Sequence, residues 1–326
     1  NDPELCKKVM KDELNEVKWK KDVILSVDFY NNWFLNFAPQ AYRDARNTAI
    51  DRVDETLIAT NNLSNITAEV LKTSPSSLGI LRMATIPPLA RDRLIGLSRV
   101  PSNLVKKMEE GILPNKVDTS ILTENLRSIV SLIKKLLDTD IFDWLNNRES
   151  PDEVRRRRAA SIIADRVCGA VADPIIRNAQ EKRQLTTISE YLTNLGYHYI
   201  QAKDVNGFEN IPAGYFSYHF NVPVNISIDK KVNIPVDVAI MRKNAKRGDF
   251  PILLECKSAG DFTNTNKRRK EEAIKIAQLR NTYGNNIEFI LFLCGYFDSG
   301  YLGYEAAEGI DWIWEHRMDD FSILKV

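Results

Sequence analysis

An apolar strand that carries two charged residues restricts most strongly what this chain can fold into. The segment PILLECKS (residues 251–258) is apolar up to Leu254 and then places Glu255 and Lys257 on either side of Cys256. Side chains alternate along a β-strand, so Glu255 and Lys257 emerge on one face while Leu254 and Cys256 point to the other. Burial of charge without a partner is costly. We therefore expect the charged pair to face a cleft.

The second half of the chain alternates between helical and β-rich segments. A helix over residues 175–195 is closed by Gly196, and β-rich runs follow in YHYIQA, YFSYHFNVPVNISI, VNIPVDVAIM and FPILLECK. KRRKEEAIKIAQLRNTYG then predicts a helix with Glu271 and Lys275 placed for an i,i+4 ion pair, ended by Gly284. IEFILFLCGYF is continuously apolar, as in a strand buried on both faces. This order predicts an α+β fold, with a mixed central β-sheet flanked by helices.

The first half of the chain is expected to be mostly helical. Apolar residues recur three and four positions apart through most of residues 1–150, with no internal repeat and no low-complexity tract. We therefore divide the chain into a helical region over residues 1–170 and a sheet domain over residues 171–326. Trp312 and Trp314 near the end are expected to be core or interface aromatics.

Composition narrows the class of protein. With 44% hydrophobic and 27% charged residues in 326, the chain is ordinary for a soluble globular protein. It has no run of eighteen apolar residues, and its charged start lacks the apolar region of a secretory signal. The four cysteines form no CxxC pair, which argues against a zinc knuckle or a disulfide framework and favours a reducing compartment.

Several common chemistries lack their motifs in this sequence. The three histidines form no HExxH, HxxxH or HNH-like group, and the expected role of each is at the surface or in the core. No Walker A segment and no GxSxG elbow is present. Cys256 is not expected to be a nucleophile, because its side chain should point into the core.

A second carboxylate is predicted to join the charged pair. VNIPVDVAIM puts Asp237 between Val236 and Val238, which should share the opposite face of the strand. If this strand pairs with residues 251–258, Asp237 stands beside Glu255. Two carboxylates that close repel each other unless a cation lies between them, and Mg²⁺ suits such oxygen ligands. Lys257 would then hold a water molecule or lower its pKa, an arrangement suited to hydrolysis of a phosphodiester.

These residues match a known motif. Pro235-Val236-Asp237 followed by Glu255-Cys256-Lys257 resembles the PD-(D/E)xK nuclease motif. Longer strings are more specific: ADPIIRNAQEKRQL, PVDVAIM, LLECKSAGDFTNTNKRRKEEA, GYFDSGYLGYEAAEGIDWIWEHR and, in the helical half, PPLARDRLIGL. Together they resemble the XamI family of type II restriction endonucleases over most of the chain.

The resemblance implies a bacterial cytoplasmic enzyme that acts as a homodimer on double-stranded DNA. It implies Mg²⁺-dependent cleavage at a short palindrome, a GTCGAC-like hexamer, leaving 5′-phosphate and 3′-hydroxyl ends, with a methyltransferase protecting host DNA. Asp237 and Glu255 would be metal ligands and Lys257 the catalytic lysine, and the Cys256 carbonyl could add a ligand. A glutamate of the preceding helix often takes part; Glu181 and Glu190 are both candidates, with Glu181 preferred.

Polar and basic clusters supply candidate DNA contacts. Thr, Asn, Lys and Arg side chains suit phosphates, adenine edges and guanine edges, and SAGDFTNTNKRRK (residues 258–270) is rich in them just beyond the catalytic strand. A solvated helix surface is the competing interpretation, and we favour it for Arg155–Arg158. The predicted contacts are Asn264, Asn266, Lys267, Arg268 and Arg269, then Arg177 and Asn178, and, in the helical half, Arg91 and Arg93.

Two alternatives remain open from the sequence. One is a PD-(D/E)xK nuclease of DNA repair or recombination that selects structure rather than sequence. The other is a non-catalytic DNA-binding protein that retains the fold.

Overall fold

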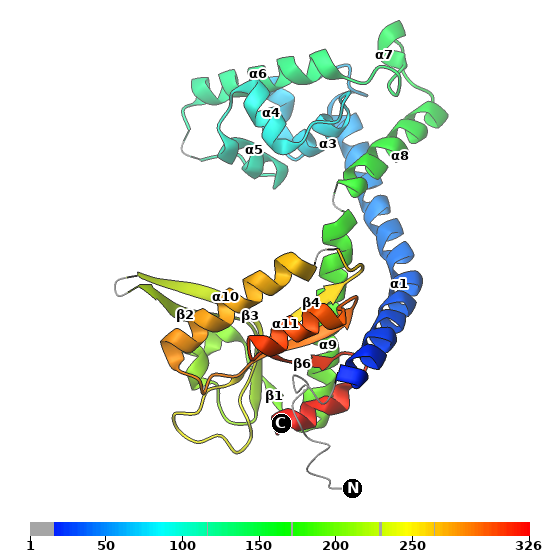
Figure 1. Ribbon diagram of the computed structural model, residues 1–326. Coiled ribbons are helices and arrows are strands. Elements are labelled where there is room, and N and C mark those ends of the chain that lie inside the picture. Colours follow the sequence, from blue (N-terminus) through cyan, green and yellow to red (C-terminus); the bar gives the residue numbers. More distant parts are fainter. Residues whose placement is uncertain (1–15, 116, 171, 228–229, 264) are drawn as a thin grey trace. The chain divides into compact units, whose positions relative to one another are not determined.

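The structure, a computed structural model, describes residues 16–115, 117–170, 172–227, 230–263 and 265–326 (Figure 1). The described residues divide into two compact units: one contains residues 16–38 and the described residues of 176–326, the other the described residues of 39–175. Both boundaries fall within helices, α1 (Glu16–Ala59) and α9 (Ala172–Asn194). The sequence-based division placed all residues up to 170 together, whereas the start of α1 groups with the sheet. Trp19 of α1 supplies the reason, since it is buried and packs edge-on against Trp312 with ring centroids 5.2 Å apart.

Residues 39–175 form a helical unit, as expected. A continuous apolar core joins its helices, centred on fully buried side chains such as Leu71, Leu81 and Leu126. The carboxylates of Asp118 and Asp152 cap two of them by accepting backbone N–H bonds of the first turn. Besides part of α1, its helices are α2 (Ala68–Thr73), α3 (Ser77–Met83), α4 (Arg91–Ser98), α5 (Ser102–Glu109), α6 (Thr119–Leu136), α7 (Trp144–Asn147) and α8 (Glu153–Gly169).

The other unit is built on a mixed six-stranded sheet in which the spatial order follows the chain order, β1 to β6. Its middle strands β2, β3 and β4 meander antiparallel, while β1 pairs parallel to β2, and β4, β5 and β6 run parallel. The strands are β1 (His198–Tyr199), β2 (Tyr215–Ser227), β3 (Lys230–Ile240), β4 (Ile252–Ala259), β5 (Phe289–Gly295) and β6 (Asp311–Trp314). The predicted mixed sheet flanked by helices is confirmed.

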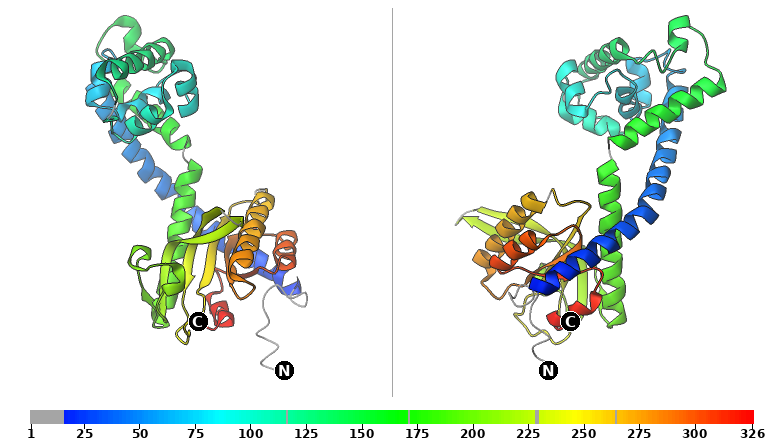
Figure 2. Two further views of the ribbon diagram at one scale, coloured as in Figure 1. Left: turned by 90° about the vertical axis from the view of Figure 1, so that its left-hand side faces the viewer. Right: turned by 45° about the vertical axis from the view of Figure 1, so that its right-hand side comes forward.

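Helices cover both faces of this sheet (Figure 2). On one face, Leu192 of α9 and Phe321 of the 3₁₀ helix η5 (Met318–Leu324) share a core with Val238. On the other, α10 (Thr265–Tyr283) and α11 (Ser299–Ala307) pack on residues such as Leu253 and Leu293. Short 3₁₀ helices η3 (Ala202–Asp204) and η4 (Phe208–Asn210) lie between β1 and β2 in the chain. Trp312 and Trp314 are buried in the α10 side of the core, as expected.

The turn after α9 shows how local sequence fixes the entry to the sheet. Gly196 has φ +81°, and its N–H donates to the carbonyl of Thr193, while the N–H of Tyr197 donates to that of Leu192. This pair of bonds is a Schellman ending, and the left-handed residue in it is normally glycine. The predicted helix end at Gly196 is therefore confirmed. Among the described residues, no helix is both long and apolar enough to cross a membrane.

Candidate active site

The two strands that carry the acidic motif separate where the motif begins. β3 and β4 pair at Ile240 with Ile252, Ala239 with Leu253 and Val238 with Leu254, and the pairing stops there. Asp237 and Glu255 are the next residues along the two strands, so they face each other across the resulting fork. The Cys256 N–H, which has left the ladder, donates to Oδ2 of Asp237 at 2.7 Å. The expectation that Asp237 lies beside Glu255 is confirmed.

One detail of the strand prediction is wrong. Val236 and Val238 were expected to share a face, but Val236 packs in the core under α10 and Val238 in the core under α9. The change of face occurs at Asp237, the residue between them. Strict alternation, on which the expectation relied, holds only for a strand with uniform twist.

A left-handed residue on the neighbouring strand accounts for the change. In β2, Tyr218 lies against the α9 core and Phe220 in the α10 core, although the pairing of β2 with β3 keeps one register from Phe216 to Asn225. His219 lies between them with φ +52°. In that register His219 is opposite Asp237. The side chains of β2 and of β3 therefore change face at the same pair of residues. The result brings His219 to the fork, where sequence reasoning had not placed it.

The environment of Asp237 disfavours its charge. Burial, and then the negative charge of Glu255, raise its pKa to about 6, against the opposing effects of the Cys256 N–H, Lys257 and Lys275. Ionisation of Asp237 at neutral pH is therefore unfavourable in the folded protein. A cation placed beside its carboxylate would stabilise the charged form.

Two lysines hold one oxygen of Glu255. Glu255 is 5% exposed. Its Oε1 accepts from Lys257 Nζ at 3.0 Å and from Lys275 Nζ at 2.6 Å. Its Oε2 is buried and has no hydrogen-bond partner in the described part of the chain. Lys275 was expected to pair with Glu271 along the helix; the structure directs it to Glu255 and to the carbonyl of Pro235 instead.

Lys257 stays protonated in this setting. Burial alone would lower its pKa, but the carboxylates of Glu255 and Glu272 outweigh burial and raise it. Its Nζ is 3.6 Å from Oε1 of Glu272 on α10. The ammonium group is therefore suited to holding a water molecule or stabilising negative charge, and not to accepting a proton.

Helix α9 supplies the opposite wall of a cavity of about 480 Å³. Glu181 and Gln184 line it from α9, together with Asp237, Glu255 and Lys257. Gln184 is buried and donates to the carbonyl of Lys257 at 3.3 Å, which ties α9 to the catalytic strand. Of the two candidate glutamates, Glu181 lines this cavity. Glu190 lines a neighbouring one of about 530 Å³ that Glu181 and His219 also border.

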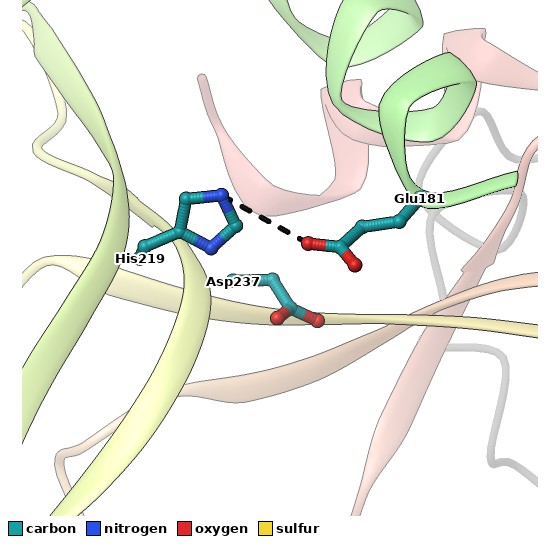
Figure 3. A group of neighbouring side chains, drawn as sticks. All are labelled: Glu181, His219 and Asp237. Atoms are coloured by element: carbon teal, nitrogen blue, oxygen red, sulfur yellow. Dashed lines mark ion pairs between the residues drawn. The ribbon is translucent and has the colours of Figure 1, made fainter. Parts of the chain in front are cut away.

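The donor set at the fork fits a hard divalent cation. Asp237 and Glu255 converge from two strands, and the unpartnered Oε2 of Glu255 lacks the donor that a buried oxygen normally has. Glu181, His219 and Asp237 also offer ligand atoms that lie within 4.8 Å of one another, with His219 Nε2 3.9 Å from Oε1 of Glu181 (Figure 3). Oxygen ligands of this kind suit Mg²⁺, and the imidazole nitrogen would also suit Mn²⁺.

Two of the predicted DNA contacts of the sheet unit line the cavities at the fork. Arg177 lines the same cavity as Asp237, and Asn178 lines the neighbouring one. The Arg269 guanidinium lies over the ring of Tyr304, 4.1 Å from its centroid. Asn264 lies outside the described residues. Asn266, Lys267 and Arg268 belong to the first turn of α10, and their side chains are outside the described set.

In the helical unit, Arg91 pairs with Glu109 at 2.5 Å and Arg93 is exposed. Arg155 of the basic run pairs with Asp143 at 2.8 Å and with Glu149 at 2.6 Å. Arg156 pairs with Asp54 at 3.0 Å. These surface pairs agree with the solvated interpretation of Arg155–Arg158.

Several residues of the site were missed from the sequence: His219, Lys275, Gln184 and Glu272. Lys275 and Glu272 read as surface charges of an ordinary helix, and only the packing of α10 on the sheet brings them to Glu255 and Lys257. The signal that could have found Glu272 is its place one turn before the apolar positions Ile276 and Leu279, which face the core.

Comparison with known proteins agrees with this geometry. Residues 61–314 match the model of the XamI restriction endonuclease family. The chain is 50% identical over 311 residues to the type II restriction enzyme SalI of Streptomyces albus G, covering 94% of this chain and 96% of that protein. A solved structure, protein VC1899 from Vibrio cholerae, is 13% identical with a TM-score of 0.29, covering 84% of this chain and 55% of that one, a likeness too low to carry an argument.

Proposed function

The chain belongs to the XamI restriction endonuclease family and is a site-specific type II endonuclease, and from that premise we propose that it hydrolyses double-stranded DNA at the Asp237–Glu255 fork with Mg²⁺. The recognised site is a GTCGAC-like palindrome, and the products carry 5′-phosphate and 3′-hydroxyl ends. Family membership favours this function over a structure-selective repair nuclease or a non-catalytic DNA-binding protein.

Asp237, Oε2 of Glu255 and the carbonyl of Cys256 would hold the ion, with Glu181 completing the set from α9. Bound there, Mg²⁺ supplies neutralisation of charge on the phosphate and activation of a water molecule. The observation that carries the proposal is the buried, unpartnered Oε2 of Glu255 next to a carboxyl group whose pKa is raised to about 6. Two buried carboxyl groups placed in this way lower the stability of the metal-free protein, and a bound cation would remove that cost.

Lys257 has the role of a charged positioning group for the attacking water. Its ammonium lines the cavity and lies 3.0 Å from Oε1 of Glu255, so a water molecule in the cavity can accept from it. The same charge stabilises the additional negative charge that develops on the phosphate oxygens during in-line attack. Lys275 keeps Glu255 in place from the other side.

The DNA contacts remain those predicted from the sequence. Arg177 at the cavity is suited to the scissile phosphate, and the first turn of α10 with Arg269 to phosphates or base edges near it. A homodimer with two-fold symmetry provides one copy of this site for each strand of a palindrome. A methyltransferase of the same restriction system would protect the host DNA without binding this enzyme.

The test is digestion of a plasmid with one GTCGAC site in the presence of MgCl₂, followed by sequencing of the ends. A plasmid with one base pair of that site exchanged, and a reaction with EDTA, are the matched controls. We expect a single linear product with ends inside the hexamer and no product in either control. A smear, or cleavage restricted to branched DNA, would show that the proposed selectivity is wrong.

A further inference from the structure

A second group of buried acidic side chains lies behind Lys257, on the two helices that cover this face of the sheet. Glu272 of α10 and Glu305 of α11 are each 0% exposed, and Tyr301 of α11 is 3% exposed. The Tyr301 hydroxyl donates to Oε2 of Glu272 at 2.7 Å, and Oε1 of Glu272 lies 3.6 Å from Lys257 Nζ. The group therefore runs from the cavity into the interior of the protein.

Such a group is expensive for a fold to keep. A carboxylate removed from water loses far more solvation free energy than one buried contact returns, and well-packed apolar residues at such positions are often at least as stable. Here burial and the charge of Glu272 raise the pKa of Glu305 to about 9, so Glu305 is neutral at pH 7. The one cation among the described residues paired with Glu272 is Lys257.

Lys257 needs such a partner because its side chain is flexible. A lysine has a four-carbon stem, and a single carboxylate fixes the position of its ammonium poorly. Glu255 holds it from β4 and Glu272 holds it from α10, so two elements define its position. With Glu255 as its only partner, the Lys257 ammonium would shift whenever the Glu255 carboxylate moved to bind an ion.

We propose that Glu272 is a positioning residue of the endonuclease: anchored by Tyr301, it holds the Lys257 ammonium at the cavity during the reaction. This inference rests on the catalytic role proposed for Lys257. It adds a residue from α10 and an anchor from α11 that the PD-(D/E)xK motif does not contain.

Single-turnover cleavage of the one-site plasmid at saturating enzyme tests the proposal. For Glu272→Gln we expect a rate constant lower by about 10–100-fold, the size usual when a partner that orients a side chain at a metal site is removed. Its affinity for the DNA, measured in a separate binding titration, should be unchanged. Tyr301→Phe, which keeps the volume, should give a smaller loss in the same direction. Two controls outside the group are Asp138→Asn, which removes another buried carboxylate paired with an arginine, and Tyr283→Phe, which removes another tyrosine hydroxyl bond, to the carbonyl of Pro223. Both should keep the wild-type rate constant.

Thermal unfolding of the metal-free protein supplies a readout independent of cleavage. Glu272→Gln should lower Tm less in a Lys257→Met background than in the wild type, because the ion pair is already lost there. Additive effects on Tm, or a wild-type rate constant for a folded Glu272→Gln protein, would overturn the inference. If Lys257→Met itself cleaves at the wild-type rate, the proposed function of Lys257 fails instead, and the two failures are thus distinguishable.

Discussion

Replacing Asp237 by asparagine should make the metal-free enzyme more stable while abolishing its activity. The asparagine side chain keeps the shape of the aspartate and an oxygen for the Cys256 N–H. It removes the charge whose pKa the fold raises from 3.8 to about 6. At about 1.4 kcal/mol per pKa unit, and after allowance for partial solvent screening, the gain in unfolding free energy is about 2 kcal/mol. For a unit of this size that raises Tm by about 4–8 °C.

The pH dependence of the gain follows from the direction of the shift. A carboxyl group with a raised folded-state pKa binds its proton more tightly in the folded protein, so its contribution to stability is greatest below the unfolded pKa and is lost as pH rises through about 6. Wild type and Asp237→Asn should therefore unfold at similar temperatures near pH 3.8 and differ fully above pH 6.

Magnesium should make the wild type more stable than Asp237→Asn, which reverses the order expected without metal. A ligand that binds only the folded state adds about 2.7 kcal/mol at one hundred times its dissociation constant. The wild type should gain this stability and Asp237→Asn should not, because one carboxylate of the fork is missing. Cleavage activity of the wild type should fall below pH 6 for the same reason, as protonation of Asp237 competes with the ion.

The assay is differential scanning calorimetry at several pH values, with EDTA or with MgCl₂. Asp249→Asn is a matched control, since Asp249 is exposed and also accepts a backbone N–H, that of Lys246, at 2.7 Å. It should show no gain in stability and no loss of the magnesium effect. A metal-free Asp237→Asn protein that is less stable than the wild type at pH 8 would refute the reasoning, because Asp237 would then be a structural ion-pair partner.

Four further substitutions test separate features of the site and the fold. If Arg269 reads a base, Arg269→Ala should weaken discrimination between the intended site and a one-base-pair variant by about 1–3 kcal/mol. Discrimination is measured as the ratio of the kcat/KM values on the two sites, and an unchanged ratio would show that Arg269 does not read a base. Lys275→Met should lower the unfolding free energy by about 1–2 kcal/mol, measured by denaturant titration, because Glu255 keeps only one cation. Gly196→Ala, at φ +81°, should destabilise by about 1 kcal/mol in the same titration, whereas Gly303→Ala in the middle of α11 should stabilise by about 0.5–1 kcal/mol.

The order of elements was predictable because each left a local signal. Glycine ends a helix in the left-handed region, and Gly196 does so with both bonds of a Schellman motif. The apolar run IEFILFLCGYF predicted a strand buried on both faces, and every residue of β5 is buried. The proximity of Asp237 to Glu255 followed from the pairing of two strands that are adjacent in the sequence.

Other features depend on twist and packing, which local patterns do not report. Alternation could not reveal that β2 and β3 turn over at His219, because that change depends on one left-handed residue that is not glycine. The i,i+4 spacing of Glu271 and Lys275 predicted a surface pair, but Lys275 gains more from the buried carboxylate of Glu255 than from an exposed one. Glu272 and Glu305 join the site only because α10 and α11 pack together on the sheet.

Lys257 is the residue on which the proposed reaction at the fork of β3 and β4 depends most directly. The decisive measurement is the single-turnover cleavage rate of Lys257→Ala on the one-site plasmid, together with its affinity for the same DNA. We predict loss of cleavage by about two to three orders of magnitude, with folding and DNA affinity retained. Cleavage by the variant at the wild-type rate would place the active site elsewhere in the molecule.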